Sequence, residues 1–293
     1  MGPIEECEKF VRRSPSVGVS VTFSLDRVIR LSGPAQLGST ARYNRLMLRM
    51  MCITAHPDDE AGGFGGSLRL YRDRGVETSV ICLTPGQAAS HRGGAKTDQE
   101  LAALRRKEFA ASCEILQVGR GIVLDYPDGQ LHRLDLYKVV YELTLCIREY
   151  RPHILLTFAS EGGVTGHMDH SMASVFATLA YHWAGRNNRY PDQLKDGLTP
   201  HRVQKLYYGT ANFTLPDRPA ISLSPATTII EIGEYLDIKI QAFRAHASQA
   251  PLFQLFERHV ARRGRQELFH LAATMDPSMM TQETDLFAGV KEK

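Results

Sequence analysis

Short apolar runs alternate with helical patterns along most of this 293-residue chain, and this alternation constrains the fold more than any other feature. Strand-like runs are predicted at 46–54, 78–83, 122–124, 154–158, 205–208 and 227–231. Helical patterns are predicted between and after them, at 60–74, 99–116, 134–150, 171–183, 233–246 and 252–263. Strands separated by helices form βαβ units, so the sequence predicts an α/β, Rossmann-like, mostly parallel sheet with helices on both faces.

The length fits one large domain with a small appendage. Hydrophobic residues make up 43% of the chain, which is enough for a substantial core. Residues 1–45 mix Pro, Ser, Gly and Arg without a sustained period. We therefore expect an N-terminal extension of unknown structure at 1–45, followed by one α/β domain at 46–293.

Charge and cysteine content narrow the partners that we expect. The net charge is +3 and no dense Lys/Arg run occurs, so a nucleic-acid partner is not expected. The five cysteines have no CxxC spacing, which argues against a cysteine zinc site and fits a reducing cytoplasm. No apolar run reaches about 18 residues, so we expect a cytoplasmic protein without a membrane partner. The sequence leaves open whether the protein forms a homo-oligomer.

One cluster of metal-ligand residue types directly follows the first predicted strand, in the run Ala55-His56-Pro57-Asp58-Asp59-Glu60. Adjacent residues at a helix start do not share a face, so Asp59 could face a metal while Asp58 stays free as a base. The alternative reading is a helix N-terminus whose acidic residues match the helix dipole. The glycines at 62–66 lack the phosphate-loop patterns and more simply allow close helix packing.

A second cluster, His167-Met168-Asp169-His170, follows the fourth predicted strand. The carboxyl ends of parallel strands lie at one edge of a sheet, so we expect both clusters to meet there and form a metal site. Two histidines and one carboxylate, here His56, His170 and Asp59, are a common catalytic zinc set with a position left open. The same set also suits Fe²⁺.

Groups beside such a metal would complete a hydrolytic site. Asp58 is placed to take a proton from water as a general base. His167 is a candidate to stabilise the oxyanion of a tetrahedral intermediate. Asp169 could orient His167 or His170 through a ring N–H.

These motifs resemble those of the LmbE-like, or PIG-L, N-acetylglucosaminyl deacetylases, which are zinc enzymes. The resemblance covers roughly residues 46–260. It extends to three further segments: Arg105-Arg106-Lys107-Glu108, Pro127-Asp128-Gly129, and Lys239 through His246-Ala247-Ser248-Gln249.

The resemblance implies specific roles for the residues of both clusters. His56, Asp59 and His170 would hold Zn²⁺. Asp58 would act as the base and then as the acid towards the leaving amine. A protonated His167 would stabilise the oxyanion, with Asp169 in support.

The resemblance also implies a substrate, a small-molecule N-acyl amino sugar. The chain would be a zinc-dependent hydrolase that removes the acetyl group from an N-acetylglucosamine-type sugar or its conjugate. Arg92 and Asp128 are the candidate sugar contacts. Gln87 stands where the family often has an acidic residue, which leaves the substrate open. The alternatives are an amidase or deacylase of another N-acyl conjugate (mycothiol-conjugate-like, antibiotic or lipid) and a non-catalytic sugar-binding Rossmann-like module.

Overall fold

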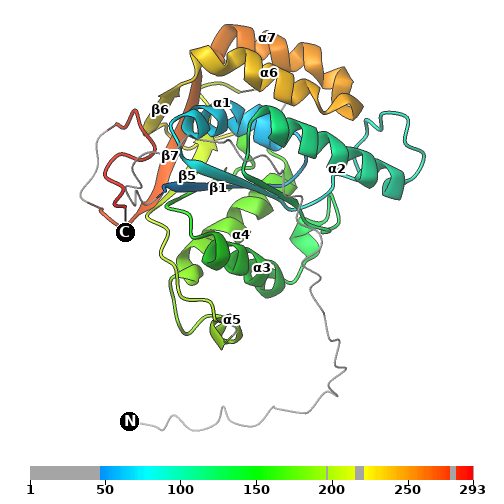
Figure 1. Ribbon diagram of the computed structural model, residues 1–293. Coiled ribbons are helices and arrows are strands. Elements are labelled where there is room, and N and C mark those ends of the chain that lie inside the picture. The colour runs from blue at the N-terminus through cyan, green and yellow to red at the C-terminus, as the bar shows by residue number, and fades with distance from the viewer. Residues whose placement is uncertain (1–46, 196, 215–220, 278–281, 293) are drawn as a thin grey trace, which may run out of the picture.

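A computed structural model describes residues 47–195, 197–214, 221–277 and 282–292, and in this part of the chain the strands form one sheet (Figure 1). The strands are β1 (Arg49–Thr54), β2 (Glu77–Cys82), β3 (Arg120–Val123), β4 (Ile154–Phe158), β5 (Lys205–Thr210), β6 (Thr228–Glu231) and β7 (Gln266–Thr274). Their spatial order is β3-β2-β1-β4-β5-β7-β6. The pairings among β1 to β5 are parallel and β7 is antiparallel to both its neighbours, which confirms the predicted mostly parallel sheet. The predicted extension at 1–45 lies outside the described residues.

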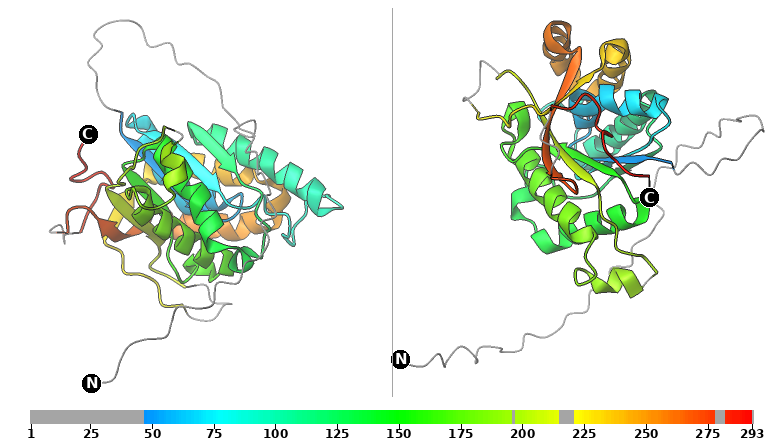
Figure 2. Two further views of the ribbon diagram at one scale, coloured as in Figure 1. Left: turned by 90° about the horizontal axis from the view of Figure 1, so that it is seen from below. Right: turned by 90° about the vertical axis from the view of Figure 1, so that its left-hand side faces the viewer.

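Helices cover both faces of this sheet, as the sequence predicted (Figures 1 and 2). They are α1 (Asp59–Asp73), α2 (Asp98–Ile115), α3 (Leu136–Tyr150), α4 (Met168–Ala184), α5 (Pro191–Lys195), α6 (Leu236–Arg244) and α7 (Phe253–Arg263). One face carries α1, α2, α6 and α7, whereas α3 and α4 lie on the other. Among the described helices, none is long and apolar enough to cross a bilayer.

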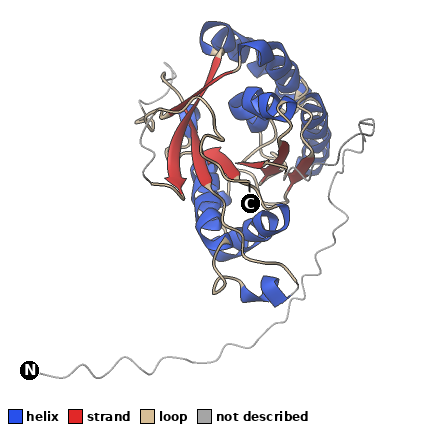
Figure 3. Cartoon of the chain, turned by 60° about the vertical axis from the view of Figure 1, so that its left-hand side comes forward, coloured by secondary structure: helices blue, strands red, loops and turns tan. Residues whose placement is uncertain are grey.

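The central strands are buried because they have helices on both sides (Figure 3). Every residue of β4 is buried, as are all residues of β1 except Arg49. Such strands read as continuous apolar runs, which is why both were predictable. The chain goes from β1 outward to β3 and returns beside β1 as β4, so the strand order reverses between β1 and β4. Ligands of open α/β sheets bind outside the carboxyl ends of the strands at this reversal.

Among the described strands and α-helices, two were not predicted from the sequence, the strand β7 and the single-turn helix α5. The side chains of β7 do not alternate between apolar and polar, because one of its buried residues is Glu267. Glu267 is buried at 2.6 Å from the ammonium group of Lys239 in α6, a partner 28 residues away. Helix α5 has five residues, too few for a periodic pattern. Helix α4 begins at Met168, three residues before its predicted start.

The glycines of α1 differ in the space around them, and this gives a matched test of helix packing. A Cβ atom on Gly66 would lie 2.3 Å from Cδ1 and 2.8 Å from Cβ of Ile232, whereas, apart from its chain neighbours and the backbone of α1 itself, none of the described atoms lies within 4 Å of one on Gly63. We expect Gly66→Ala to lower the free energy of unfolding by about 1–3 kcal/mol through overpacking. Gly63→Ala should raise it by up to about 1 kcal/mol through helix propensity. Urea unfolding tests both, and a Gly66→Ala protein as stable as the parent would contradict the packing.

Candidate metal centre

His56 lies two residues beyond the end of β1, and its ring is fixed by acidic neighbours on one side. Its Nε2 is 3.0 Å from an oxygen of Asp128 and 3.4 Å from an oxygen of Asp169. Those carboxylates can only accept, so the ring proton belongs on Nε2 and the lone pair on Nδ1. Nδ1 points towards Asp59, whose nearer oxygen is 3.6 Å away.

The two adjacent aspartates separate at the start of α1, as the sequence suggested. Asp59 is the first helical residue, and one of its oxygens accepts the main-chain N–H groups of Ala55 and His56 at 3.2 and 2.8 Å. Its other oxygen is 3.1 Å from Nε2 of His170. Asp58 is the N-cap residue with φ 109°, and its carboxylate accepts from Arg105 at 2.9 Å. Asp59 therefore belongs to the histidine cluster, while Asp58 stands beside it.

His170 lies in the first turn of α4 and is held on three sides. Its Nδ1 is 3.2 Å from the carbonyl oxygen of Gly162 and 3.3 Å from the hydroxyl of Thr165. Its ring stacks on Phe158 at the end of β4, with centroids 4.0 Å apart. A carbonyl accepts the Nδ1 proton, so Nε2, which faces Asp59, is the nitrogen that could bind a metal.

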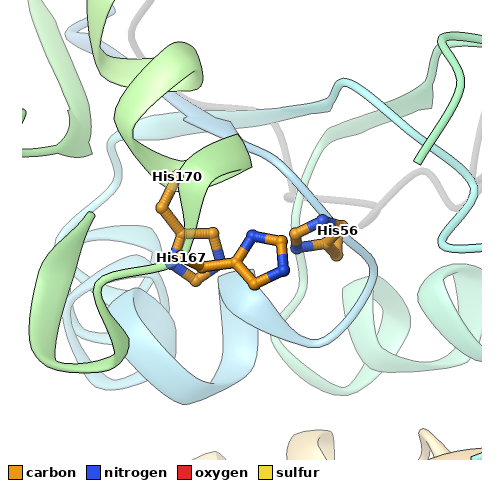
Figure 4. Close-up of side chains that lie close together, drawn as sticks. All are labelled: His56, His167 and His170. Atoms are coloured by element: carbon orange, nitrogen blue, oxygen red, sulfur yellow. The ribbon is translucent and has the colours of Figure 1, made fainter. Parts of the chain in front are cut away.

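His167 is the N-cap of α4 and the exposed member of the cluster (Figure 4). Its Nδ1 accepts the main-chain N–H of Asp169 at 3.2 Å. The ring proton of the neutral form is therefore on Nε2, where it can be donated to a ligand. Its ring centroid lies 4.8 Å from that of His56 and 5.2 Å from that of His170.

His56, Asp59 and His170 offer two imidazole nitrogens and a carboxylate, residue types that bind divalent metals. Ligand atoms around tetrahedral zinc stand about 3.3 Å apart, given bonds of about 2.0–2.1 Å. Nε2 of His170 lies 3.1 Å from Oδ1 of Asp59, and Nδ1 of His56 lies 3.6 Å from Oδ2, so each histidine faces a different oxygen of the carboxylate at close to that separation. Both rings also have their second nitrogen beside an oxygen acceptor, as metal-ligating histidines usually do.

Two other groupings share His56. One nitrogen from each of His56, His167 and His170 can be chosen so that all three lie within 4.8 Å of one another. The same limit encloses His56, Asp128 and Asp169. In the second grouping the carboxylates face Nε2 of His56, the nitrogen that carries the proton, so we regard them as supports of the ring. The three-histidine grouping is a genuine rival, because it replaces Asp59 by His167.

The side chains of Asp169 and Asp128 make other contacts than the sequence predicted. We expected Asp169 to orient His167 or His170, but its buried carboxylate accepts the N–H groups of Gly129 and Leu131 at 2.6 and 3.2 Å and lies against His56. Asp128 was expected to contact a sugar. Its carboxylate is buried between His56 and the N–H of Ala88, which donates to it at 2.8 Å.

The structure brings all the expected site residues together except Arg92. Its guanidinium donates to the carboxylate of Asp98 at 2.9 Å and to the carbonyl of Ala95, both within its own loop and the start of α2. Sequence reasoning gave no role to Arg105, which is 3% exposed and donates to Asp58, to the carbonyl of Pro57 and to the carbonyl of Gly86. The sequence feature that could have indicated a role for Arg105 is its place in the Arg105–Glu108 motif, which the chain shares with the family it resembles.

The charges of the cluster agree with a site built for a cation. Burial disfavours the charged form of Asp59, but His170 and His56 hold the pKa of this carboxyl well below its usual range. Burial raises the pKa of Asp58 to about 6 against the opposing effect of Arg105. Burial and the neighbouring His56 and His170 lower the pKa of His167, so the neutral ring, which still donates from Nε2, is favoured.

Comparison with known proteins agrees with the motifs. The profile of a family described as "PIG-L: GlcNAc-PI de-N-acetylase" matches residues 51–181. The diacetylchitobiose deacetylase of Thermococcus kodakarensis is 31% identical over 211 residues, covering 71% of this chain and 73% of that protein. The mycothiol S-conjugate amidase of Streptomyces coelicolor is 26% identical over 292 residues, covering 84% and 98%.

A solved structure shares the fold. The N,N'-diacetylchitobiose deacetylase from Pyrococcus horikoshii superimposes with a TM-score of 0.64 at 23% identity, covering 79% of this chain and 87% of that one. The resemblance drawn from the motifs is thus confirmed over most of the chain. By sequence and by fold, the chain belongs to the PIG-L family of LmbE-like deacetylases.

Proposed function

We propose that the protein is a zinc-dependent hydrolase that removes the acetyl group from an N-acetylglucosamine-type amino sugar or its conjugate. Family membership supports an N-deacetylase. The observation that carries the proposal is the meeting of His56, Asp59 and His170 beside Asp58, at the carboxyl ends of β1 and β4. Zinc is proposed over ferrous iron because two imidazoles and one carboxylate with an open position are a recurrent catalytic zinc set.

The contacts of each residue in the cluster suit one role in amide hydrolysis. A divalent ion held by His56, Asp59 and His170 would polarise the acyl carbonyl and acidify water. Asp58 takes the proton from water and returns it to the leaving amine. His167 donates a hydrogen bond from Nε2 to the developing oxyanion. Asp128 and Asp169 keep the ring of His56 in one orientation and one tautomer.

A second candidate is the cleavage of another N-acyl conjugate. It is favoured by the likeness to the mycothiol S-conjugate amidase, which extends over 98% of that protein. The residues of the cluster suit either amide, because the loops decide which acyl group and which amine are bound. The non-catalytic sugar-binding alternative is not retained, since the relatives are named as enzymes.

A substrate panel separates the two candidates. Acetate release is measured from N-acetylglucosamine, diacetylchitobiose, and the N-acetylglucosaminyl inositol and malate conjugates, and amine release from a mycothiol conjugate. We expect kcat/KM for one N-acetylglucosamine compound to exceed that for the mycothiol conjugate by at least about tenfold, or about 1.4 kcal/mol. Turnover of the mycothiol conjugate alone would favour the amidase, and no turnover of any compound would contradict both.

A further inference from the structure

A group of buried polar side chains contacts Asp58 and its neighbours, and several of these side chains come from helix α2. Arg105, Glu108 and Ser112 are three and four residues apart, so they share one face of α2. All three side chains are buried; Arg105 and Ser112 contact the start of α1, and Glu108 contacts the turn after α6. Arg105 donates to Asp58, Glu108 accepts from Ser248, and Ser112 donates to Glu60 at 2.6 Å. The face thus ties the start of α1 to the turn after α6.

Asp58 needs such support because its backbone is strained. Its φ of 109° lies in the left-handed region that non-glycine residues rarely occupy. Its main-chain N–H donates to Oε2 of Glu60 at 3.0 Å, and its side chain is held by Arg105. The position of the Asp58 carboxylate therefore depends on both contacts, one at each end of the residue.

Glu60 is in turn held by His246, which is 186 residues away in the sequence. Nε2 of His246 lies 2.7 Å from Oε1 of Glu60, and both side chains are fully buried. Among the described residues, Nδ1 of the same ring has no hydrogen-bond partner. Among the described residues, the carboxylate of Glu60 is thus the hydrogen-bond partner of the buried His246 ring. A buried carboxylate that lost this donor would turn towards another one.

We propose that His246 is a positioning residue for the general base: through Glu60 it holds the main-chain N–H of Asp58, and so fixes where the Asp58 carboxylate stands. This rests on the proposed function, in which Asp58 moves the proton. The side chain of His246 is fully buried and hydrogen-bonds to Glu60, not to His56, Asp59 or His170. Its loss should therefore slow turnover without weakening the binding of substrate or metal.

Two substitutions of His246 test this proposal. His246→Leu removes the donor to Glu60, whereas His246→Gln keeps an N–H at the place of Nε2. Because a misplacement of about 1 Å can cost about 10²-fold in rate, we expect His246→Leu to lower kcat by about 10–10²-fold. KM and the metal content should stay within about twofold of the parent, as for an interaction that matters in the transition state. His246→Gln should restore kcat to within about threefold of the parent.

Several results would overturn the proposal. Parental kcat in His246→Leu, an equal loss in His246→Gln, or loss of bound metal would each contradict it. If His246→Leu does not fold, Glu60→Gln carries the test. Its amide keeps the shape but has one acceptor in place of two, so kcat should again fall by about tenfold or more. Parental kcat in that variant would equally overturn the proposal.

Two controls keep the outcome specific. His201→Leu removes a half-buried ring that hydrogen-bonds to the carbonyl of Pro152, before the start of β4, and it should leave kcat unchanged. Asp58→Asn separates the two claims. Full turnover in Asp58→Asn would refute the base itself. An inactive Asp58→Asn beside a fully active His246→Leu would refute the positioning role alone.

Discussion

Asp58→Asn is expected to lower kcat by about 10²–10⁴-fold while the protein keeps its metal, because the loss of a general base typically costs that much. The metal should stay because the Asp58 carboxylate faces Arg105, whereas the oxygens of Asp59 face His170 and the N–H groups of Ala55 and His56. Asparagine keeps an oxygen for Arg105, so the start of α1 should not rearrange. Steady-state kinetics and metal analysis measure the two quantities on the same preparation.

Asp73→Asn is the matched control, since Asp73 pairs with Arg69 at the far end of the same helix. It should leave kcat and metal content unchanged. An Asp58→Asn protein that loses its metal would place Asp58 among the ligands. One that turns over at the parental rate would show that another group moves the proton.

His170→Ala is expected to abolish measurable turnover by lowering metal affinity more than about 100-fold. Losing even a partner that orients a ligand typically costs 10–100-fold, and loss of the ligand itself should cost more. The ring of His170 is fixed by Gly162, Thr165 and Phe158, so its Nε2 is held beside Asp59 and is lost with the side chain. Dialysis against a weak chelator, followed by metal analysis, measures the loss. His182→Ala, an exposed histidine near the other end of α4, should keep its metal.

His167→Ala decides between the two possible ligand sets. If Asp59 is the third ligand, this variant should keep its metal while kcat falls by about 10²–10³-fold, the usual loss for an oxyanion donor. If the three histidines hold the ion, His167→Ala should lose its metal as His170→Ala does. The exposed position of His167 and its place as the N-cap of α4 favour the first outcome.

The sequence was most informative where a motif is contiguous and follows a buried strand. His56 and Asp59 are three residues apart, as are His167 and His170, so each pair was visible without the fold. The two pairs could be brought together by one rule, that parallel strands end at a common edge. The same reasoning divided Asp58 from Asp59, and their different hydrogen-bond partners agree with that division.

Contacts between distant segments could not be predicted in this way. Asp169 meets His56 because the turn after β3 presents the N–H groups of Gly129 and Leu131 to its carboxylate. Nothing in the local pattern of Asp169 reveals that turn. The pairing of Glu60 with His246 likewise depends on how α6 packs beside α1 and α2. These supporting residues are polar, buried and far apart in sequence, so they carry no periodic signal.

The most direct test of the account is acetate release before and after the metal is removed. The protein is treated with a chelator, assayed on the N-acetylglucosamine compound that it turns over best, and then supplied with Zn²⁺ or Fe²⁺. Activity should fall to the level of Asp58→Asn after chelation and return with one equivalent of Zn²⁺ per chain. Acetate release that persists in the metal-free protein would contradict the metal centre at His56, Asp59 and His170. If only Fe²⁺ restored acetate release, the metal centre would stand and the ion in it would be iron and not zinc.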